Sequence, residues 1–158
     1  FLNKRKVIFL TSILSLVFFL TFNNLKSQEI KVIDGDTIHL NGEKIRFTGI
    51  DTPEIKQICI KGMTEVNCGI KAKQLLINKI DNNDIKCIRE GKDQYKRTLA
   101  ECFVNNESLS RYLVRNGFAF AYRKYSDKFI IDEDYARVNK IGIWSMRFDY
   151  PWDYRKKN

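Results

Sequence analysis

Residues 29–54 read EIKVIDGDTIHLNGEKIRFTGIDTPE, a pattern that predicts three short antiparallel β-strands joined by tight turns. Asn41-Gly42 is a strong two-residue hairpin signal, and Ile45 and Phe47 are apolar positions of the returning strand. Pro53 ends that strand, because proline cannot donate a hydrogen bond to a ladder. We therefore expect strands at 29–34, 37–40 and 44–50.

The rest of the chain predicts three helices, a second hairpin and a short aromatic strand. Ser108 is an N-cap for the second helix, and Gly142 closes the third. The expected helices cover 69–80, 109–116 and 132–140; the hairpin strands 85–89 and 98–104; the aromatic strand 118–122; and 55–68 is expected to be a loop. This order favours an α+β fold, a five-stranded OB-type β-barrel with three helices.

Length and composition are those of one folded domain. The chain has 158 residues, of which 44% are hydrophobic and 13% aromatic. Neither a repeat nor a linker divides it. We expect the domain at 28–146, preceded by a separate segment at 1–27 and followed by a basic, aromatic tail at 147–158.

The N-terminal segment has the pattern of an export signal. Lys4, Arg5 and Lys6 precede an apolar run at 7–22, with no acidic residue in 1–27. We expect an exported protein, secreted or periplasmic, and a retained membrane anchor at 7–22 is the alternative. Removing four of the 28 basic side chains leaves 24 against 19 acidic, a net charge of +5 that mildly favours a polyanionic partner.

Four cysteines suit an exported protein, and without a C-x-x-C pair their spacing argues against structural zinc. Of the three possible pairings we favour Cys59 with Cys68 and Cys87 with Cys102. The second pair lies symmetrically about the turn near Gln94 and Tyr95, which would place its members opposite each other on antiparallel strands. Buried free thiols are the alternative.

Three carboxylates and two arginines indicate metal-assisted chemistry on a phosphate ester. Asp36 and Asp51 lie at two turns that could meet at one end of the barrel, and two such carboxylates favour a hard cation between them. Thr52 adds an oxygen ligand. Glu54 could accept a proton from an attacking water. The arginines that could hold the phosphate oxygens are Arg46 and Arg97.

Other interpretations of the same residues are weaker. Each position taken alone is most often a turn aspartate or a solvated arginine. His39 is the single histidine, so two-histidine ribonuclease chemistry is excluded, and on its strand it is expected to point outward. Asp36 with the Glu54-Ile55-Lys56 triplet loosely matches restriction-type nucleases, but that pattern leaves Arg46 and Arg97 unexplained.

At these residues the chain resembles the staphylococcal nuclease (thermonuclease) family over roughly 29–145. The cysteine positions and the ending Pro151-Trp152-Asp153-Tyr154-Arg155 resemble an exported bacterial branch of that family. The matching motifs are Asp34-Gly35-Asp36-Thr37, Arg46, Asp51-Thr52-Pro53-Glu54, Asp93 with Tyr95, Arg97, Leu99 and Ala100, Leu113-Val114-Arg115 with Gly117, and Gly142-Ile143-Trp144.

The resemblance implies an OB-barrel enzyme that uses Ca²⁺ to hydrolyse DNA and RNA and leaves 3′-phosphates. Carried over by position, Asp36, Asp51 and the Thr52 carbonyl would ligate calcium, and Glu54 would assist the attacking water. Arg46 and Arg97 would stabilise the transition state. The residues implied to contact the nucleotide are Tyr95 and Tyr122, with Tyr122 stacking on the base.

Three departures from the family pattern concern affinity rather than chemistry. Lys96 stands where the family often has glycine, and Gln94 stands where a lysine can touch the terminal phosphate. The loop after Glu54 is longer and carries Cys59 and Cys68.

We expect the protein to be a monomer. The alternative function is a catalytically silent nucleic-acid-binding OB module, although such a module would not need Arg46, Glu54 and Arg97 together.

Overall fold

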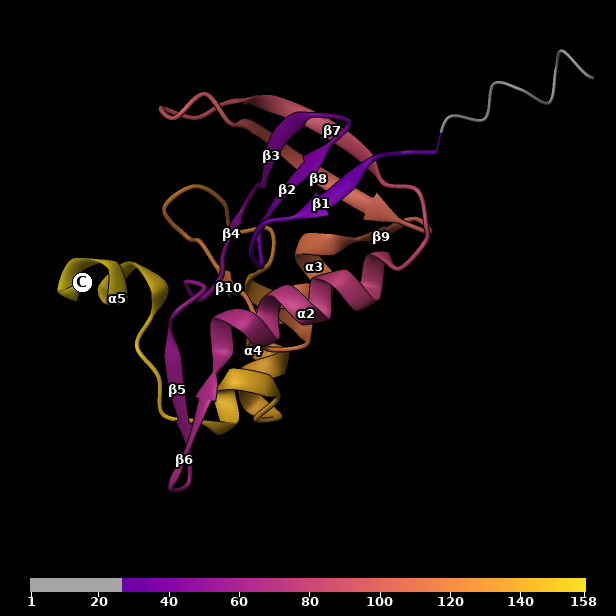
Figure 1. The fold of residues 1–158 in the computed structure, drawn as a ribbon. Helices are drawn as coiled ribbons and strands as arrows, with labels where there is room; N and C mark the ends of the chain where they lie inside the picture. Colours follow the sequence, from indigo (N-terminus) through magenta and orange to yellow (C-terminus); the bar gives the residue numbers. More distant parts are fainter. Residues whose placement is uncertain (1–26) are drawn as a thin grey trace, which may run out of the picture.

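The computed structural model describes residues 27–158, so the predicted export segment lies almost wholly outside the described residues. A twisted sheet forms one layer and the helices gather below it (Figure 1). The sheet runs in the order β1-β2-β3-β8-β7, with β9 paired to β8. Its strands are β1 (Ile30–Val32), β2 (Thr37–Leu40), β3 (Glu43–Phe47), β7 (Lys86–Lys92), β8 (Thr98–Val104) and β9 (Glu107–Ser108).

The predicted α+β fold with an OB-type sheet is confirmed, although within residues 27–158 the sheet does not close into a barrel. β3 pairs with β8 in parallel, and every other pair in this sheet is antiparallel. Among residues 27–158 the two outer strands, β1 and β7, do not pair with each other. Instead the Gln28 side-chain amide bonds to the backbone of Ile85 in both directions, at 2.9 and 2.7 Å, and links the two edges.

Two helices pack on the sheet and bury the core against it, and a third packs on the second of them. They are α2 (Cys68–Ile80), α3 (Leu109–Arg115) and α4 (Ile130–Val138). Asn67 caps α2 and Ser108 caps α3, each through a side-chain oxygen that accepts a backbone N–H. The core joins strand residues to α2 and α3; among its members are Ile38, Ile45, Phe47, Leu76, Ala100 and Leu113.

Three expectations of local structure were wrong. The strand expected at 44–50 is interrupted by a turn at Thr48 and Gly49, and Ile50–Asp51 is a separate strand. Residues 55–68 are not a loop but contain a hairpin, β5 (Ile58–Lys61) and β6 (Thr64–Asn67), which turns at Gly62 with a φ of 63°. A fourth helix, α5 (Pro151–Lys157), follows the 3₁₀ turn η1 (Gly142–Ser145). Proline at its start and basic residues in its last turn are helix signals, but seven residues are too few to form a helix without tertiary support.

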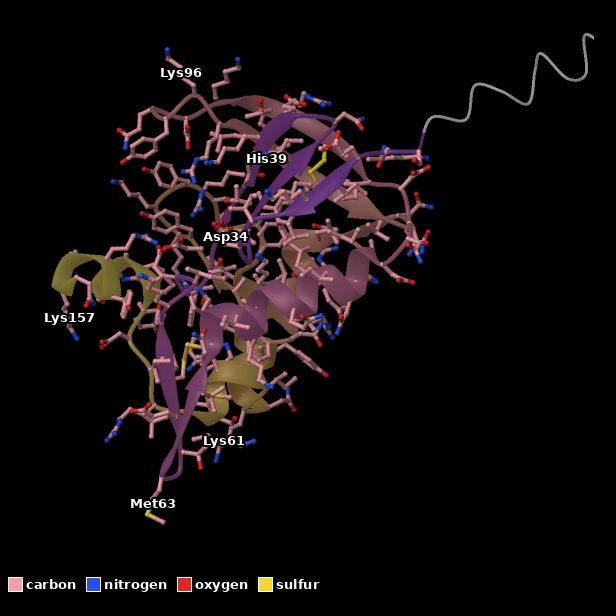
Figure 2. All side chains as sticks on the ribbon, in the orientation of Figure 1. Asp34, His39, Lys61, Met63, Lys96 and Lys157 are labelled. Carbon is pink, nitrogen blue, oxygen red and sulfur yellow. A yellow bond between two sulfur atoms is a disulfide. The ribbon has the colours of Figure 1, made fainter. Side chains whose placement is uncertain are left out.

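Both predicted disulfides are present, Cys59–Cys68 and Cys87–Cys102. Cys87 and Cys102 are register partners on β7 and β8, as the symmetry about the predicted turn implied. The other bond ties β5 to the start of α2, and the hairpin that it anchors projects from the body with Met63 at its tip (Figure 2).

A two-stranded pair connects the sheet to the helices. β4 (Ile50–Asp51) pairs with β10 (Phe120–Ala121), and Asp51 lies opposite Phe120.

None of the helices within residues 27–158 combines the length and the apolar character that crossing a membrane would require.

Candidate active site

The turn between β1 and β2 places Asp36 in a buried position. A side-chain oxygen of Asp34 accepts the Asp36 backbone N–H at 3.1 Å, which fixes the turn. Gly35 packs so closely that a Cβ there would lie 2.8 Å from Thr52 Oγ1. The carboxylate of Asp36 accepts two hydrogen bonds of 3.0 Å from Thr52, one from the backbone and one from the hydroxyl. The turn therefore brings the predicted ligands Asp36 and Thr52 together.

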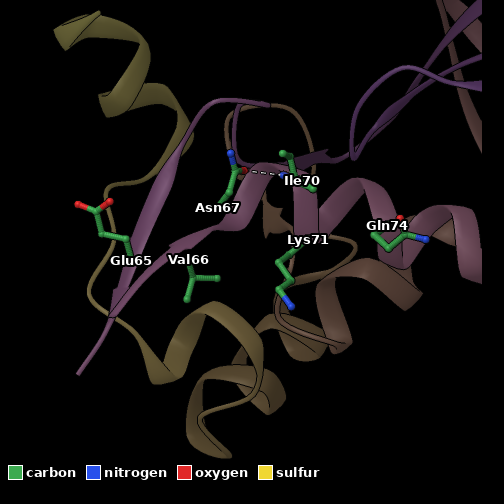
Figure 3. Close-up of a pocket in the computed structure, with 6 residues that line it drawn as sticks. All are labelled: Glu65, Val66, Asn67, Ile70, Lys71 and Gln74. Atoms are coloured by element: carbon green, nitrogen blue, oxygen red, sulfur yellow. Dashed lines mark hydrogen bonds between the residues drawn. The ribbon is translucent and has the colours of Figure 1, made fainter. Parts of the chain in front are cut away.

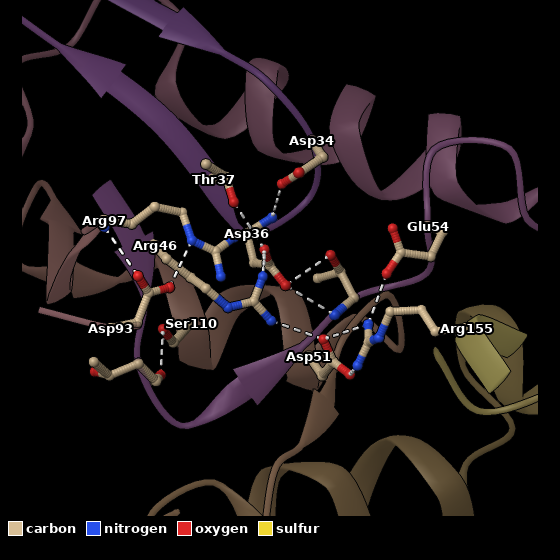
Figure 4. Close-up of polar contacts among 12 residues, drawn as sticks. Asp34, Asp36, Thr37, Arg46, Asp51, Glu54, Asp93, Arg97, Ser110 and Arg155 are labelled. Atoms are coloured by element: carbon tan, nitrogen blue, oxygen red, sulfur yellow. Dashed lines mark hydrogen bonds and ion pairs between the residues drawn. The ribbon is translucent and has the colours of Figure 1, made fainter. Parts of the chain in front are cut away.

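Arg46 joins the two aspartates. Its Nη1 donates to Asp36 Oδ1 at 2.6 Å and its Nη2 donates to Asp51 Oδ1 at 2.8 Å (Figure 4). Both carboxylates are buried, with exposures of 2% and 1%, whereas the Arg46 side chain keeps 19%. We call these three residues the barrel corner. Since one guanidinium reaches both, the two turns do meet at one end of the sheet.

Electrostatics at the barrel corner favour extra positive charge. Burial raises the pKa of Asp36, Arg46 opposes that rise, and the carboxylates of Asp34 and Asp51 add to it, so that the pKa stands at about 7. Burial lowers the pKa of Arg46, but Asp36 and Asp51 outweigh this effect and raise it overall. A cation near Asp36 would offset the penalty of burying its charge.

Arg97 approaches from the neighbouring strand. β3 and β8 pair in parallel with Ile45 opposite Thr98, so Arg97 comes next to the strand that carries Arg46. Its Nε donates to Asp93 Oδ2 at 2.7 Å, and the Tyr95 ring lies 5.5 Å from its guanidinium carbon. Burial opposes ionisation of Asp93, yet hydrogen bonds from Arg97 hold its pKa below the usual value. Figure 4 draws this pair on the far side of Arg46 from Glu54.

Glu54 stands on a tightly supported loop. Its backbone N–H donates to Gln57 Oε1 at 3.1 Å, and its carbonyl accepts from Gln57 N at 2.8 Å. A Cβ on Gly69 would lie 1.9 Å from the Glu54 carbonyl oxygen, so only glycine fits there. Sequence reasoning missed Gly69, because the contact follows from how α2 approaches the loop.

Sequence reasoning also missed Arg155, on α5. Its Nη2 donates to Asp51 Oδ2 at 2.7 Å, and its Nη1 donates to Glu54 Oε1 at 2.7 Å and to Asp51 Oδ1 at 3.3 Å (Figure 4). Burial lowers the pKa of Arg155, but Asp51 and Glu54 raise it well above its usual value. The sequence signal for Arg155 was its place in the ending 151–155, which resembles the exported branch of the family. That resemblance gave Arg155 no role.

The two tyrosines predicted to contact the nucleotide differ in their surroundings. Tyr95 is 71% exposed beside Arg97. Tyr122 is half-buried, and its ring stacks on Trp152 with centroids 5.7 Å apart and planes within 8°. One face of Tyr122 is thus already covered by the C-terminal segment. His39 lies on β2 opposite Lys44 and takes no part in the contacts drawn in Figure 4.

The donor set at the barrel corner suits a hard cation. Asp36, Asp51 and Thr52 offer only oxygen, the element that Ca²⁺ and Mg²⁺ prefer. Asp36 is buried with a raised pKa, which marks a place where added positive charge is favourable. Within residues 27–158, no three side chains from histidine, cysteine, aspartate and glutamate gather closely enough to hold a metal by themselves. A cation here would therefore need Thr52 or solvent to complete its ligands.

Two shallow hollows lie on the surface of the described residues. One, of about 300 Å³, borders the site and is lined by Glu54, Ile55, Lys56, Tyr154, Arg155 and Asn158. The other, of about 380 Å³, lies between β6 and α2 (Figure 3) and is lined by Glu65, Val66, Asn67, Ile70, Lys71 and Gln74. The charged groups that line the second hollow are one carboxylate, Glu65, and one ammonium, Lys71. These two groups do not form a catalytic site for hydrolysis.

Residues 44–146 match the family described as staphylococcal nuclease homologue, which is more than half of the chain. The chain belongs to the staphylococcal nuclease family. The match covers Arg46, Glu54 and Arg97, and it begins after Asp36 and ends before α5.

Several proteins are similar to this staphylococcal nuclease homologue. One named as an uncharacterized endonuclease of Haemophilus influenzae is 29% identical over 123 residues, 73% of this chain and 64% of that protein. Endonuclease YncB of Bacillus subtilis is 33% identical over 132 residues, 73% of this chain and 59% of YncB. A probable staphylococcal-like nuclease of rice, CAN2, is 28% identical over 116 residues, 72% of this chain and 29% of CAN2. The matches thus span less than two thirds of these relatives.

Proposed function

We propose that this protein is a calcium-dependent phosphodiesterase that hydrolyses DNA and RNA and leaves 3′-phosphates. The observation that carries the proposal is the meeting of Asp36, Arg46 and Asp51 at one end of the sheet, with Glu54 joined to Asp51 through Arg155. Membership of the staphylococcal nuclease family and the endonuclease names of two bacterial relatives support nuclease activity.

The calcium ion would be held by Asp36, Asp51 and the Thr52 carbonyl, and when bound it supplies positive charge to a nonbridging phosphate oxygen. Glu54 accepts a proton from water as the water oxygen attacks phosphorus. The bond from phosphorus to the 5′-oxygen breaks, and that oxygen takes up a proton to leave a 5′-hydroxyl. The phosphate stays on the 3′-oxygen of the preceding nucleotide.

The arginines act on charge that grows during this step. In this proposal Arg46 and Arg97 donate to the nonbridging oxygens, and Arg97 also assists the leaving oxygen. A preorganised donor of this kind contributes about 3 kcal/mol to lowering the barrier. Tyr95, exposed beside Arg97, is available to contact the nucleotide.

The experiment is cleavage of end-labelled single-stranded DNA and RNA in Ca²⁺ and then in EDTA. We expect cleavage of both polymers in Ca²⁺, 3′-phosphate ends, and loss of activity in EDTA. Glu54→Gln keeps the size of the side chain and should lower kcat by at least about 100-fold. Binding without cation-dependent cleavage would instead identify a silent nucleic-acid-binding module.

We also propose that the protein acts as a monomer outside the cytoplasm, either secreted or periplasmic. The two disulfides support this location, because such bonds persist in oxidising compartments. The intact mass of protein taken from the native cell envelope distinguishes a cleaved export signal from an anchor retained at 7–22. Sedimentation of the purified protein tests the monomer.

A further inference from the structure

The Glu54 carboxylate has one side-chain partner among residues 27–158. Arg155 Nη1 donates to Glu54 Oε1 at 2.7 Å, across 101 residues of sequence. The Glu54 side chain is 41% exposed, so apart from this contact solvent surrounds much of it. The loop fixes the backbone of Glu54 through Gln57, but the direction of the carboxylate depends on Arg155.

The same guanidinium also binds Asp51. Nη2 donates to Asp51 Oδ2 at 2.7 Å and Nη1 to Asp51 Oδ1 at 3.3 Å, and Asp51 is 1% exposed. Because the guanidinium is planar and rigid, two contacts on Asp51 fix its orientation and leave Nη1 aimed at Glu54. A surface ion pair of two mobile side chains would lack this buried anchor.

The C-terminal strap, residues 147–158, is docked well enough to hold Arg155 in place. Ile60 and Arg147 exchange two backbone hydrogen bonds of 2.8 and 2.9 Å. The buried Gln57 donates its Nε2 to the Asp149 carbonyl at 2.7 Å, so one amide joins the Glu54 loop to the strap. Two tyrosine rings flank Trp152 in parallel, Tyr150 at 4.7 Å and Tyr122 at 5.7 Å.

We propose that Arg155 is a positioning residue for the nuclease reaction, which holds the Glu54 carboxylate in register with Asp51. The C-terminal strap is then a part of the active site rather than an appendage. The inference rests on the proposed function. It separates Arg155 from Arg46 and Arg97, because Arg155 acts through Glu54 and not on the phosphate.

A double-mutant cycle tests the proposal, with single-turnover cleavage of an end-labelled oligonucleotide in Ca²⁺. Arg155→Gln should lower kcat by about 100-fold, the loss expected when a reacting group is misplaced by about 1 Å, while KM stays within about threefold. In a Glu54→Gln background the same change should lower kcat by less than about threefold, because the group that Arg155 positions has already been removed.

Matched variants separate positioning from charge and folding. Lys156→Gln removes one positive charge from the same helix, where Lys156 pairs with Asp153 and is 74% exposed, and should leave kcat within about twofold. Arg155→Lys keeps the charge without the planar fork and should recover less than about a tenth of the lost activity. Oligonucleotide affinity in EDTA, measured without any turnover, should be the same for wild type and Arg155→Gln within about threefold.

Three results would overturn the proposal: wild-type kcat in Arg155→Gln, equal fold losses in both backgrounds, or a tenfold loss of affinity in EDTA that identifies a phosphate contact. Each presumes that the wild type cleaves. A wild type without cation-dependent cleavage would instead reject the proposed function, so the two failures are distinguishable. Arg155→Gln is accepted as folded when its thermal unfolding remains cooperative.

Discussion

The barrel corner and the strap present two kinds of ion pair within one site. In the barrel corner, Arg46 binds two carboxylates that are 2% and 1% exposed. On the strap, Arg155 is 40% exposed and joins the buried Asp51 to Glu54, which is 41% exposed. The buried pairs contribute to folding, because neither carboxylate could stay charged there without a partner. The exposed contact between Arg155 and Glu54 sets the direction of one side chain and contributes little to stability, whereas the contact with Asp51 gives Arg155 a buried anchor.

The largest expected effect is a difference in the free energy of unfolding between variants of Arg46 and Arg155. Arg46→Gln should lower the free energy of unfolding by about 3–5 kcal/mol, because two buried carboxylates lose a shared partner. Arg155→Gln should lower it by less, about 1–2 kcal/mol, because Asp51 loses one guanidinium partner but keeps Arg46. Urea unfolding followed by fluorescence in EDTA measures both. Equal losses would contradict the distinction between the barrel corner and the strap.

Removal of one disulfide should affect stability alone, whereas removal of the other should affect both stability and catalysis. Cys87–Cys102 closes a 15-residue interval, so Cys87→Ser with Cys102→Ser should lower stability by about 3 kcal/mol, with kcat within about threefold. Cys59→Ser with Cys68→Ser should lower kcat by about tenfold as well, because Cys68 precedes Gly69, which lies against Glu54. Unfolding and cleavage assays on the same preparations check both. Unchanged kcat in the second variant would show that the Glu54 loop does not need its disulfide.

Between pH 5 and 7, the pH dependence of stability should come from Asp36. The pKa of Asp36 is about 7 in the fold against 3.8 as the ordinary value, so between these limits the folded protein holds a proton that the unfolded chain releases. Stability should therefore fall as pH rises from 5 to 7, by at most about 1.4 kcal/mol per pH unit. Unfolding in EDTA at several pH values measures the slope. Asp36→Asn should flatten it and Arg155→Gln should not; the same slope in wild type and Asp36→Asn would contradict the prediction.

The smallest expected effect concerns the turn that carries Arg97. Lys96 has a φ of 62°, a left-handed conformation that favours glycine, and it is the position where the family pattern often has glycine. Lys96→Gly should raise stability by about 0.5 kcal/mol through relief of backbone strain. Thermal unfolding detects such a change. A clear loss of stability would show that the Lys96 side chain contributes more than its backbone strain subtracts.

Much of the fold and the barrel corner could be predicted from sequence, because their signals are local. Asn41-Gly42 gave the β2–β3 turn, the spacing about Gln94 and Tyr95 gave the Cys87–Cys102 pair, and the turn motifs brought Asp36 and Asp51 together. The β5–β6 hairpin was missed because its strands are only four residues long and the cysteines at 59 and 68 were interpreted as the base of a loop. α5 was missed because a seven-residue helix forms only where other elements support it.

The sequence by itself determined the carboxylates, the two central arginines and the cysteine pairing, since each follows from a short motif or an interval between elements. Only the tertiary structure placed Arg155 on Asp51 and Glu54, 104 and 101 residues away, and Gly69 against the Glu54 carbonyl. The reason is that these contacts depend on how whole elements pack. Local sequence fixes turns and strands, but the meeting of the strap with the barrel follows from burial of Trp152 and its neighbouring rings.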